Sequence, residues 1–463
     1  MVVIQQFVIQ SPKKSFKKSP LIERKINLIS LGCSKNTVDS EQLAKQLKLN
    51  DFKIVFDSKK HLPITIINTC GFINDAKEQS IETILECVKA KSEGKIKMLI
   101  VFGCLVQRYK QSLVKEIPEV DAFFGVHNVS NILAYLEAQF FPDHLIKREL
   151  STPHHYAYLK ISEGCNHNCA FCAIPQIRGK HISKPLEQIV REAELLAENG
   201  TKELILIAQD LNYYGIDLYK KSYLDKLLKE LLNIPSLEWI RLHYMYPNKF
   251  PIEVIDTMKD EKRICSYLDI PLQHINDAVL QAMKRSITEK EIRTLIDTVR
   301  TKIPNLALRT SFITGFPGET KKIYRQLENF IAEIQFDRLG VFTYSHEENT
   351  SAYALKDTIS KKEKEERKEN LMFIQQEISL RKNQEKEGKT LKVLVDDENK
   401  SHYIGRTEFD SPEVDNSVFI AKKTNTCEKG KFYPIRITKA DYFDLYGDID
   451  TKNKNTTSDF EIK

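Results

Sequence analysis

The sequence predicts an α/β fold of two parallel-sheet units followed by a small antiparallel β-barrel. From about residue 25 to residue 380, apolar β-type runs alternate with amphipathic helical runs, which is the pattern of repeated βαβ units. A polar segment near residues 140–155 interrupts this alternation in the manner of a linker. Residues 389–447 then change to short β-type runs, at a spacing typical of a small barrel.

These breaks set the expected boundaries of the units. The charged run over 361–389 predicts one long helix that ends at Gly388 and braces the fold without carrying chemistry. The polar end of the chain is expected to be a disordered tail. In order, we expect a flexible basic extension over 1–23, an N-terminal α/β unit over 24–142, a second α/β unit over 151–382, a barrel over 383–450 and the tail over 451–463.

Composition limits the possible functions. The 463 residues carry 70 Lys and Arg against 64 Asp and Glu, a net charge of +6, and residues 1–24 alone hold five basic residues and one acid. The remaining chain is therefore near +2, which gives little support for nucleic-acid binding.

No apolar run approaches the roughly 18 to 20 residues of a membrane span. The first lysines follow an apolar run, which is the opposite of the order in a signal peptide. We expect a cytoplasmic protein without a membrane partner, whose nine cysteines serve metal or redox chemistry.

Three cysteines lie close together in the segment SEGCNHNCAFC: Cys165, Cys169 and Cys172. A structural zinc site uses four ligands, so zinc would need His167 or His181 as the fourth. A disulfide with a spare thiol is less expected in the cytoplasm. A [4Fe–4S] cluster with three cysteine ligands is the third interpretation, and it leaves one iron open to a small molecule.

A second set of cysteines is dispersed along the chain. Cys33, Cys70 and Cys104 each end an apolar β-type run, in INLISLGC, ITIINTC and MLIVFGC. These cysteines are separated by 37 and 34 residues along the chain. Because the carboxyl ends of parallel strands share one edge of a sheet, we expect all three to meet at a single site. The three thiolates suggest a second cluster with an open iron, although free cysteines are often simply buried. We interpret the remaining cysteines as structural: Cys87, Cys265 and Cys427.

The spacing C-x3-C-x2-C, after an apolar run and with Phe171 before the third cysteine, resembles the radical S-adenosylmethionine (SAM) enzymes. In that superfamily the open iron binds SAM. With the second cysteine set and the terminal barrel, the chain resembles the radical SAM methylthiotransferases. Their fold combines an N-terminal cluster domain, a radical SAM (β/α) partial-barrel core and a small TRAM β-barrel.

Several motifs place the resemblance in the RimO branch of that family: LGCSKNTVDSE, INTCGFINDAKEQSIE, AQDLNYYG, DIPLQH and FDRLGVFTYSHEENTSAY. The resemblance implies methylthiolation of an aspartate β-carbon on small-subunit ribosomal protein S-twelve. It also implies two [4Fe–4S] clusters, with SAM as both methyl donor and radical source, and an electron donor such as flavodoxin or ferredoxin; the sulfur donor stays unassigned. The alternatives are a transfer RNA adenosine methylthiotransferase and a non-catalytic iron–sulfur electron carrier.

Polar residues at other strand ends are candidates to contact SAM. The run ELILIAQD ends in two of them, and RTSFITGFPGE runs from a strand into a glycine turn of the kind that packs near SAM in the family, although such turns are common. We expect His274 and His346 to be structural. The predicted residues of the SAM vicinity are Gln209, Asp210, Gln273, Arg309, Gly315 and Gly318.

The charge of the barrel bears on the partner. Residues 384–447 hold eleven Lys and Arg against twelve Asp and Glu, a net of −1. An RNA-binding barrel needs a basic surface to meet phosphates. The count therefore favours a basic protein, such as a ribosomal protein, over transfer RNA.

Overall fold

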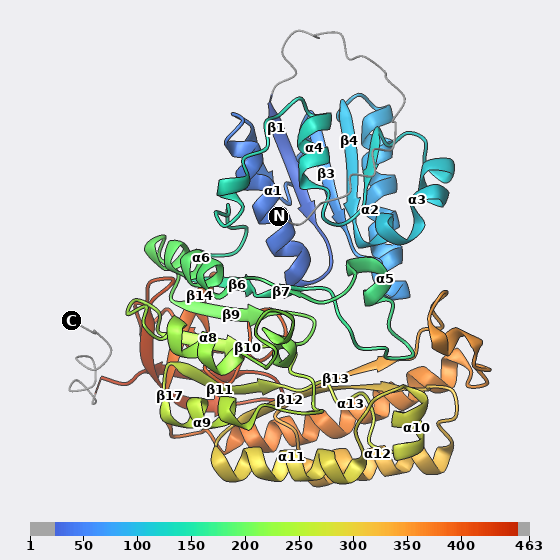
Figure 1. Cartoon of the computed structure of the whole chain (residues 1–463). Coiled ribbons are helices and arrows are strands. Elements are labelled where there is room, and N and C mark those ends of the chain that lie inside the picture. The colour runs from blue at the N-terminus through green and yellow to red at the C-terminus, as the bar shows by residue number, and fades with distance from the viewer. Residues whose placement is uncertain (1–23, 452–463) are drawn as a thin grey trace.

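The computed structural model describes residues 24–451, which form two stacked α/β units and a barrel (Figure 1). The extension expected over 1–23, and the tail apart from residue 451, lie outside the described residues. Within residues 24–451, no helix has the length and apolar character needed to cross a membrane.

The N-terminal unit is a five-stranded parallel sheet in the order β2-β1-β3-β4-β5. Strands β3 and β4 are buried along their whole length, which explains their continuous apolar sequences. Helices cover both faces of the sheet, and a separate apolar core fills each side. The elements are β1 (Lys25–Ser30), α1 (Ser34–Lys48), β2 (Lys53–Phe56), β3 (Ile64–Thr69), α2 (Asn74–Ser92), β4 (Met98–Gly103), α3 (Cys104–Glu116), β5 (Ala122–Phe124), α4 (Val129–Tyr135) and η1 (Pro142–His144).

The second unit is an open parallel sheet in the order β13-β12-β11-β10-β9-β6. Helices α9, α11 and α12 lie on the side of this sheet away from the N-terminal unit (Figure 1). Its strands and helices are β6 (Tyr156–Lys160), α6 (Leu186–Glu198), β9 (Glu203–Ile207), α8 (Leu224–Leu231), β10 (Trp239–Leu242), α9 (Ile252–Asp260), β11 (Ile264–Asp269), α11 (Glu289–Lys302), β12 (Ala307–Thr314), α12 (Lys321–Ile334) and β13 (Arg338–Thr343). Short elements are β7 (Ser162–Glu163), α5 (Ile174–Arg178), β8 (Ile182–Ser183), η2 (Leu211–Tyr213), α7 (Ile216–Tyr219), α10 (Asp277–Ala282) and η3 (Ser351–Ala354).

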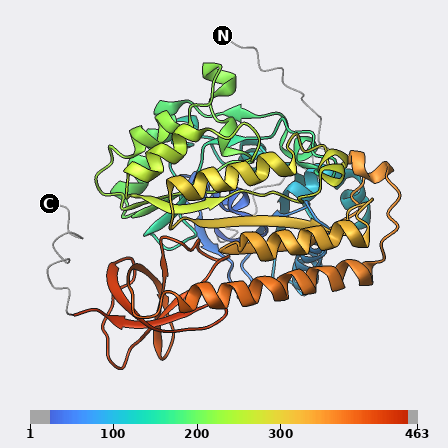
Figure 2. The same ribbon diagram turned by 90° about the horizontal axis from the view of Figure 1, so that it is seen from below.

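The predicted charged helix is α13 (Lys361–Gln384), which ends four residues before Gly388. It runs beside α12 and leads directly into the barrel (Figure 2). Leu371, Gln375 and Ile378 are buried at helical spacing, so one side of this helix is packed and the other is solvated. The helix therefore braces the second unit, as expected.

The barrel closes in the order β14-β15-β16-β18-β17. Its pairs are antiparallel except β16 with β18, which is parallel. The last part of the predicted β-type region, residues 432–447, forms two strands, because Asp441 accepts hydrogen bonds from two following backbone amides and turns the chain. The strands are β14 (Thr390–Glu398), β15 (His402–Thr407), β16 (Val418–Ala421), β17 (Phe432–Ala440) and β18 (Leu445–Ile449).

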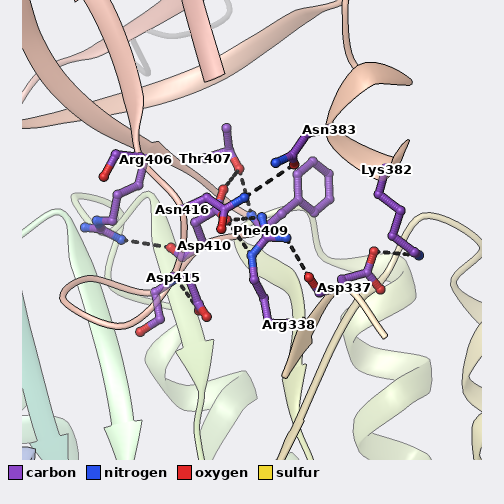
Figure 3. A network of polar contacts seen from close by, with 12 residues as sticks. Asp337, Arg338, Lys382, Asn383, Arg406, Thr407, Phe409, Asp410, Asp415 and Asn416 are labelled. Atoms are coloured by element: carbon purple, nitrogen blue, oxygen red, sulfur yellow. Dashed lines mark hydrogen bonds and ion pairs between the residues drawn. The ribbon is translucent and has the colours of Figure 1, made fainter. Parts of the chain in front are cut away.

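A buried polar network joins the barrel to the second unit (Figure 3). Arg338 of β13 donates from Nε to Asp410 Oδ1 at 3.0 Å, and its Nη2 contacts the same oxygen. Thr407 Oγ1 donates to Asp410 Oδ2 at 2.6 Å. Burial opposes the charge of Asp410, but Arg338 and Lys386 outweigh it and hold the carboxyl pKa below its ordinary value. The barrel is thus locked to the sheet by a desolvated ion pair.

Candidate functional site

All six cysteines of the two predicted sets line one cavity of about 460 Å³. Its walls come from both α/β units: the strand ends of the N-terminal sheet on one side, and the carboxyl ends of strands in the second sheet on the other. Sequence segments separated by more than 300 residues therefore face one space.

The dispersed set meets at one sheet edge, as the strand pattern predicts. Cys33 precedes α1, Cys70 directly follows β3, and Cys104 begins α3 directly after β4. Strands β1, β3 and β4 are parallel neighbours, so their carboxyl ends lie together. The topology brings together three thiols that the sequence separates.

Gly32 makes this approach possible. A Cβ at residue 32 would lie 2.7 Å from Cys70 Cβ and 3.1 Å from its Sγ, and the backbone φ is +96°. Real Cβ atoms do not tolerate contacts that short, and L side chains rarely adopt that φ. Only glycine fits between the first two cysteines of this set.

The compact set occupies the loop between β7 and α5. The amide of Ala170 donates to Met283 O at 2.8 Å, and Ala170 O accepts from the amide of Ala352 at 2.8 Å. The backbone of this loop is thus held from two distant segments. Burial raises the pKa of Cys165 to about 11 and that of Cys172 to about 12, so iron binding at these thiols would release protons.

The two histidines considered as zinc ligands already have partners. His167 stacks on Tyr246 with ring centroids 3.9 Å apart, and its Nε2 lies 2.7 Å from Asp210 Oδ2. His181 is buried with Nε2 2.9 Å from Ser183 Oγ, and it does not line the cavity. Neither ring is placed to close a four-ligand zinc site.

The donor set fits [4Fe–4S] clusters better than single ions. Every cysteine in residues 24–451 is a free thiol. Over the same range, no three Cys, His, Asp or Glu side chains gather closely enough to hold one metal ion. A cubane cluster binds each cysteine through a different iron, so it requires a wider spacing of thiols around a larger space. Each set supplies the three cysteine ligands that such a cluster with one open iron uses, and both sets face one cavity.

Arg178 of α5 connects the two sets. Its Nη2 donates to Asn36 Oδ1 at 2.6 Å and to Cys104 Sγ at 3.6 Å, while Nη1 donates to Asp39 and Glu163, both at 3.0 Å. Burial disfavours the guanidinium charge, but Asp39 and Glu163 outweigh burial and hold its pKa above the ordinary value. This side chain links the compact loop to the edge of the N-terminal sheet.

Two further cations line the cavity. Lys35 lies with Nζ 3.3 Å from the centroid of the Tyr244 ring, and burial lowers its pKa to about 8. Arg285 lies over Tyr246 at 4.1 Å, with Nη1 3.9 Å from Cys169 Sγ. Arg285 Nε is buried and has no hydrogen-bond partner among residues 24–451.

Glu347, after β13, ties the second unit to the N-terminal one. It is buried and accepts from Lys77 of α2 and Arg108 of α3, both at 2.9 Å. Burial opposes its charge, but hydrogen bonds from Ser345, Lys77 and Arg108 hold the Glu347 pKa below its ordinary value. This contact fastens the rim of the cavity.

Of the residues predicted near SAM, Gln209 and Gln273 line the cavity. Gln273 has a backbone φ of +72°, a strained conformation of the kind found at functional sites. Asp210 does not line the cavity, but its side chain contacts His167, which does.

The other predicted residues lie outside the cavity walls. Arg309 pairs with Asp269 at 3.4 Å and with Asp415 at 3.3 Å. A Cβ at Gly315 would meet Lys364 Cγ at 2.3 Å, whereas one at Gly318 would meet open space. The two histidines expected to be structural have protein partners: His274 lies 3.2 Å from Glu319, and His346 stacks on Tyr353.

Sequence reasoning missed several cavity residues: Lys35, Arg178, Tyr244, Tyr246, Arg285 and Glu347. The first two had a local signal, since each is a basic residue within six positions of a cysteine of one set. The others have none, because long-range folding alone brings them to the cavity.

Comparisons with known proteins agree with this architecture. Residues 25–125 match the Uncharacterized protein family UPF0004, residues 159–331 match the Radical SAM superfamily, and residues 388–449 match the TRAM domain. A solved structure of the radical SAM methyltransferase TsrM from Kitasatospora setae is similar in fold, with a TM-score of 0.51 and 14% identity. The similarity covers 69% of this chain and 72% of that one.

Relatives named "Ribosomal protein uS12 methylthiotransferase RimO" match nearly the whole chain. The protein of Christiangramia forsetii is 49% identical over 94% of this chain and 95% of its own length. That of Chlorobaculum tepidum is 48% identical over 92% of this chain and 98% of its own length.

The three matched regions and the cavity define a radical SAM enzyme of the methylthiotransferase class, which uses a [4Fe–4S] cluster and SAM. Within that class, the chain belongs to the RimO family.

Proposed function

We propose that this enzyme methylthiolates the β-carbon of an aspartate in small-subunit ribosomal protein uS12, using two [4Fe–4S] clusters and SAM as methyl donor and radical source. The observation that carries the proposal is the meeting of two three-cysteine sets at one cavity. The substrate is the one named for the relatives that match more than 90% of the chain.

Each cysteine set would hold one cluster. Cys165, Cys169 and Cys172 would bind the cluster that takes SAM, and the set from the N-terminal sheet would bind the auxiliary cluster. When bound, the clusters and SAM supply electron transfer, radical generation and sulfur for a C–H bond too weakly acidic for general-base chemistry.

The protein's own residues position these groups. Asp210 Oδ2 accepts a hydrogen bond from His167 Nε2 and keeps that ring on Tyr246, beside the compact loop. Arg178 holds the two cysteine sets in a fixed relation through Asn36 and Glu163. Such rigid support matters because transfer chemistry depends on sub-ångström placement of the reacting groups.

The walls of the cavity are largely apolar. Apolar side chains from both units line the cavity, and the contacts of Glu347 with Lys77 and Arg108 fasten its rim. A dry cavity protects a reactive radical from side reactions.

We assign different roles to the predicted SAM residues. Gln209 and Gln273 would contact SAM directly, since both line the cavity. Asp210 would act through His167. Arg309, Gly315 and Gly318 would shape the strand and turn behind the cavity.

The partner proteins follow from the proposed substrate. The near-neutral barrel suits a basic ribosomal protein better than transfer RNA. A small redox protein such as flavodoxin or ferredoxin would supply the electrons. A ribosomal-protein substrate would also place the reaction in the cytoplasm.

The test is product analysis with two substrates. Reconstituted enzyme, SAM and a reductant are incubated separately with purified uS12 and with unmodified transfer RNA. We expect a methylthio mass gain on one aspartate of uS12 and none on RNA. A gain on transfer RNA alone would refute the proposed substrate while keeping the chemistry.

A further inference from the structure

Lys35 is a buried cation that forms no salt bridge with a carboxylate in the described part of the chain; the strongest attraction on its charge comes from the Cys33 thiol two residues away. It is 6% exposed, lines the cavity, and is the second residue of α1. Among residues 24–451 it forms no salt bridge within 4.0 Å. Its ammonium contacts the face of Tyr244 at 3.3 Å. Fully buried lysines are rarely left without a charged partner, so this one is a candidate to meet a charge that enters the cavity.

The carboxylates near Lys35 already form ion pairs with other cations. Asp39 contacts both Lys160 and Arg178, and Glu163 contacts the same two side chains. Asp269 pairs with Arg309 across the strand pair β11 and β12. The ammonium of Lys35 therefore retains unused hydrogen-bond donors toward the cavity.

The ring beneath Lys35 is itself held in an uncommon conformation. Tyr244 has a backbone φ of +63°, although it is a bulky residue for which that region is unfavourable. Its amide donates to Asp269 Oδ2 at 3.3 Å, which supports that conformation. Strained residues of this kind concentrate at ligand sites, where the rest of the fold stabilises them.

Among residues 24–451, two cations that line the cavity form no salt bridge, and they lie beside different cysteine sets. Lys35 lies two residues after Cys33, beside the cysteine set of the N-terminal sheet. Arg285 lies against Cys169 of the compact set, where SAM would bind. A SAM carboxylate would be nearer to Arg285, which leaves Lys35 for a second anion on the side of the auxiliary cluster.

We propose that the Lys35 ammonium receives the side-chain carboxylate of the target aspartate and so selects aspartate as the modified residue. The inference rests on the proposed function. Modification at the β-carbon places the carboxylate one bond from the reacting carbon. That carboxylate must be paired when it leaves water for the cavity. An ion pair with Lys35 satisfies this need and holds the β-carbon beside the cysteine set that would carry sulfur.

The proposal predicts how the enzyme discriminates between aspartate and asparagine. Asparagine has nearly the same shape but no charge, so its Oδ1 could accept a hydrogen bond from Lys35 without supplying the counter-charge that the buried ammonium needs. A site built around a specific polar partner rejects an analogue that lacks it, here by about 100-fold.

The experiment tests four forms of the enzyme against two substrates. Wild-type enzyme and the Lys35→Met variant are reconstituted, their iron is counted, and each is given uS12 or uS12 with the mapped target aspartate changed to asparagine. Binding is measured without reductant, and product is measured with it. Lys35→Arg tests rescue of the charge, and Lys45→Met, on the same helix but outside the cavity, is the matched control.

We expect the wild type, Lys35→Arg and Lys45→Met to prefer aspartate by about 100-fold, and Lys35→Met to prefer it by less than about threefold, with iron content unchanged. Equal weakening of both substrates by Lys35→Met, or loss of iron, would overturn the proposal and leave the function standing. Failure of the wild type to act on uS12 would overturn the function and this inference together.

Discussion

The two cysteine sets reach the same cavity by opposite routes. Cys165, Cys169 and Cys172 lie within eight residues of one loop, and their geometry is set by local chain contacts. Cys33, Cys70 and Cys104 span 72 positions and meet only because three parallel strands are neighbours. The first arrangement depends on a loop held at two points, whereas the second depends on the whole N-terminal sheet.

This difference has functional consequences. The loop can be specialised for one small molecule without changing the core, since loops tolerate change more easily than sheet edges do. The sheet-edge set is as rigid as the unit that carries it. A cluster held at the sheet edge would therefore be suited to hold the sulfur that is transferred. A cluster held in the loop would be suited to bind and cleave SAM.

The largest effect should come from breaking one set at a time. Cys169→Ala should abolish both SAM cleavage and product, because SAM would bind at that cluster. Cys104→Ala should abolish product and leave SAM cleavage within about threefold. Separate assays of 5′-deoxyadenosine and methylthiolated uS12 measure the two. Cys87→Ala, a buried cysteine outside the cavity, is the control, and identical losses in both variants would contradict the division of roles.

Removing Arg178 should weaken the link between the sets. Arg178→Met leaves Asp39 and Glu163 with one cation fewer, so we expect a loss of about 3 to 5 kcal/mol in unfolding free energy. Denaturant unfolding measures it. Arg191→Met removes an ion pair whose arginine is 52% exposed and should lower the unfolding free energy far less than Arg178→Met does. Equal, small losses would mean that Arg178 is not a structural link.

Asp410 belongs to the polar network between the barrel and the second unit, so its substitution should affect stability without affecting the cysteine sets. Asp410→Asn should destabilise the fold by about 2 to 3 kcal/mol near pH 7, with iron content unchanged. Because the folded pKa of Asp410 is depressed, its charge stabilises the fold above the unfolded pKa of about 4 and loses that effect as pH falls through the folded value. The difference between variant and wild type should therefore shrink below about pH 4. A difference independent of pH would exclude an ionised Asp410.

The smallest effects distinguish two glycines with the same backbone constraint. Gly32 and Gly318 have φ of +96° and +94°, but only Gly32 has a cysteine where a Cβ would lie. Gly318→Ala should cost about 1 to 2 kcal/mol of stability and keep all the iron. Gly32→Ala should lower the stability by a similar amount, and it should also reduce the iron bound by the sheet-edge set. Iron counts and thermal unfolding compare them; full iron in Gly32→Ala would show that the edge tolerates displacement of Cys70.

The sequence predicted the fold and the cysteine sets because both depend on patterns with a short period or a simple topology. Strand-ending cysteines at Cys33, Cys70 and Cys104 needed only the rule that parallel strand ends share an edge. It could not predict that Arg285 would reach Cys169, since the two are separated by 116 positions and no local pattern links them. Asp210 follows the carboxyl end of β9, but its side chain contacts His167, and Arg309 lies near the start of β12, where its side chain contacts Asp415 rather than the cavity.

Iron counting tests the central claim most directly. Wild type, the triple variant Cys33→Ala, Cys70→Ala, Cys104→Ala and the triple variant Cys165→Ala, Cys169→Ala, Cys172→Ala are each reconstituted without oxygen. Two four-iron clusters predict about eight irons in the wild type and about four in each triple variant. Four or fewer in the wild type, with no loss in the sheet-edge variant, would contradict the claim that the strand ends of the N-terminal sheet hold a cluster.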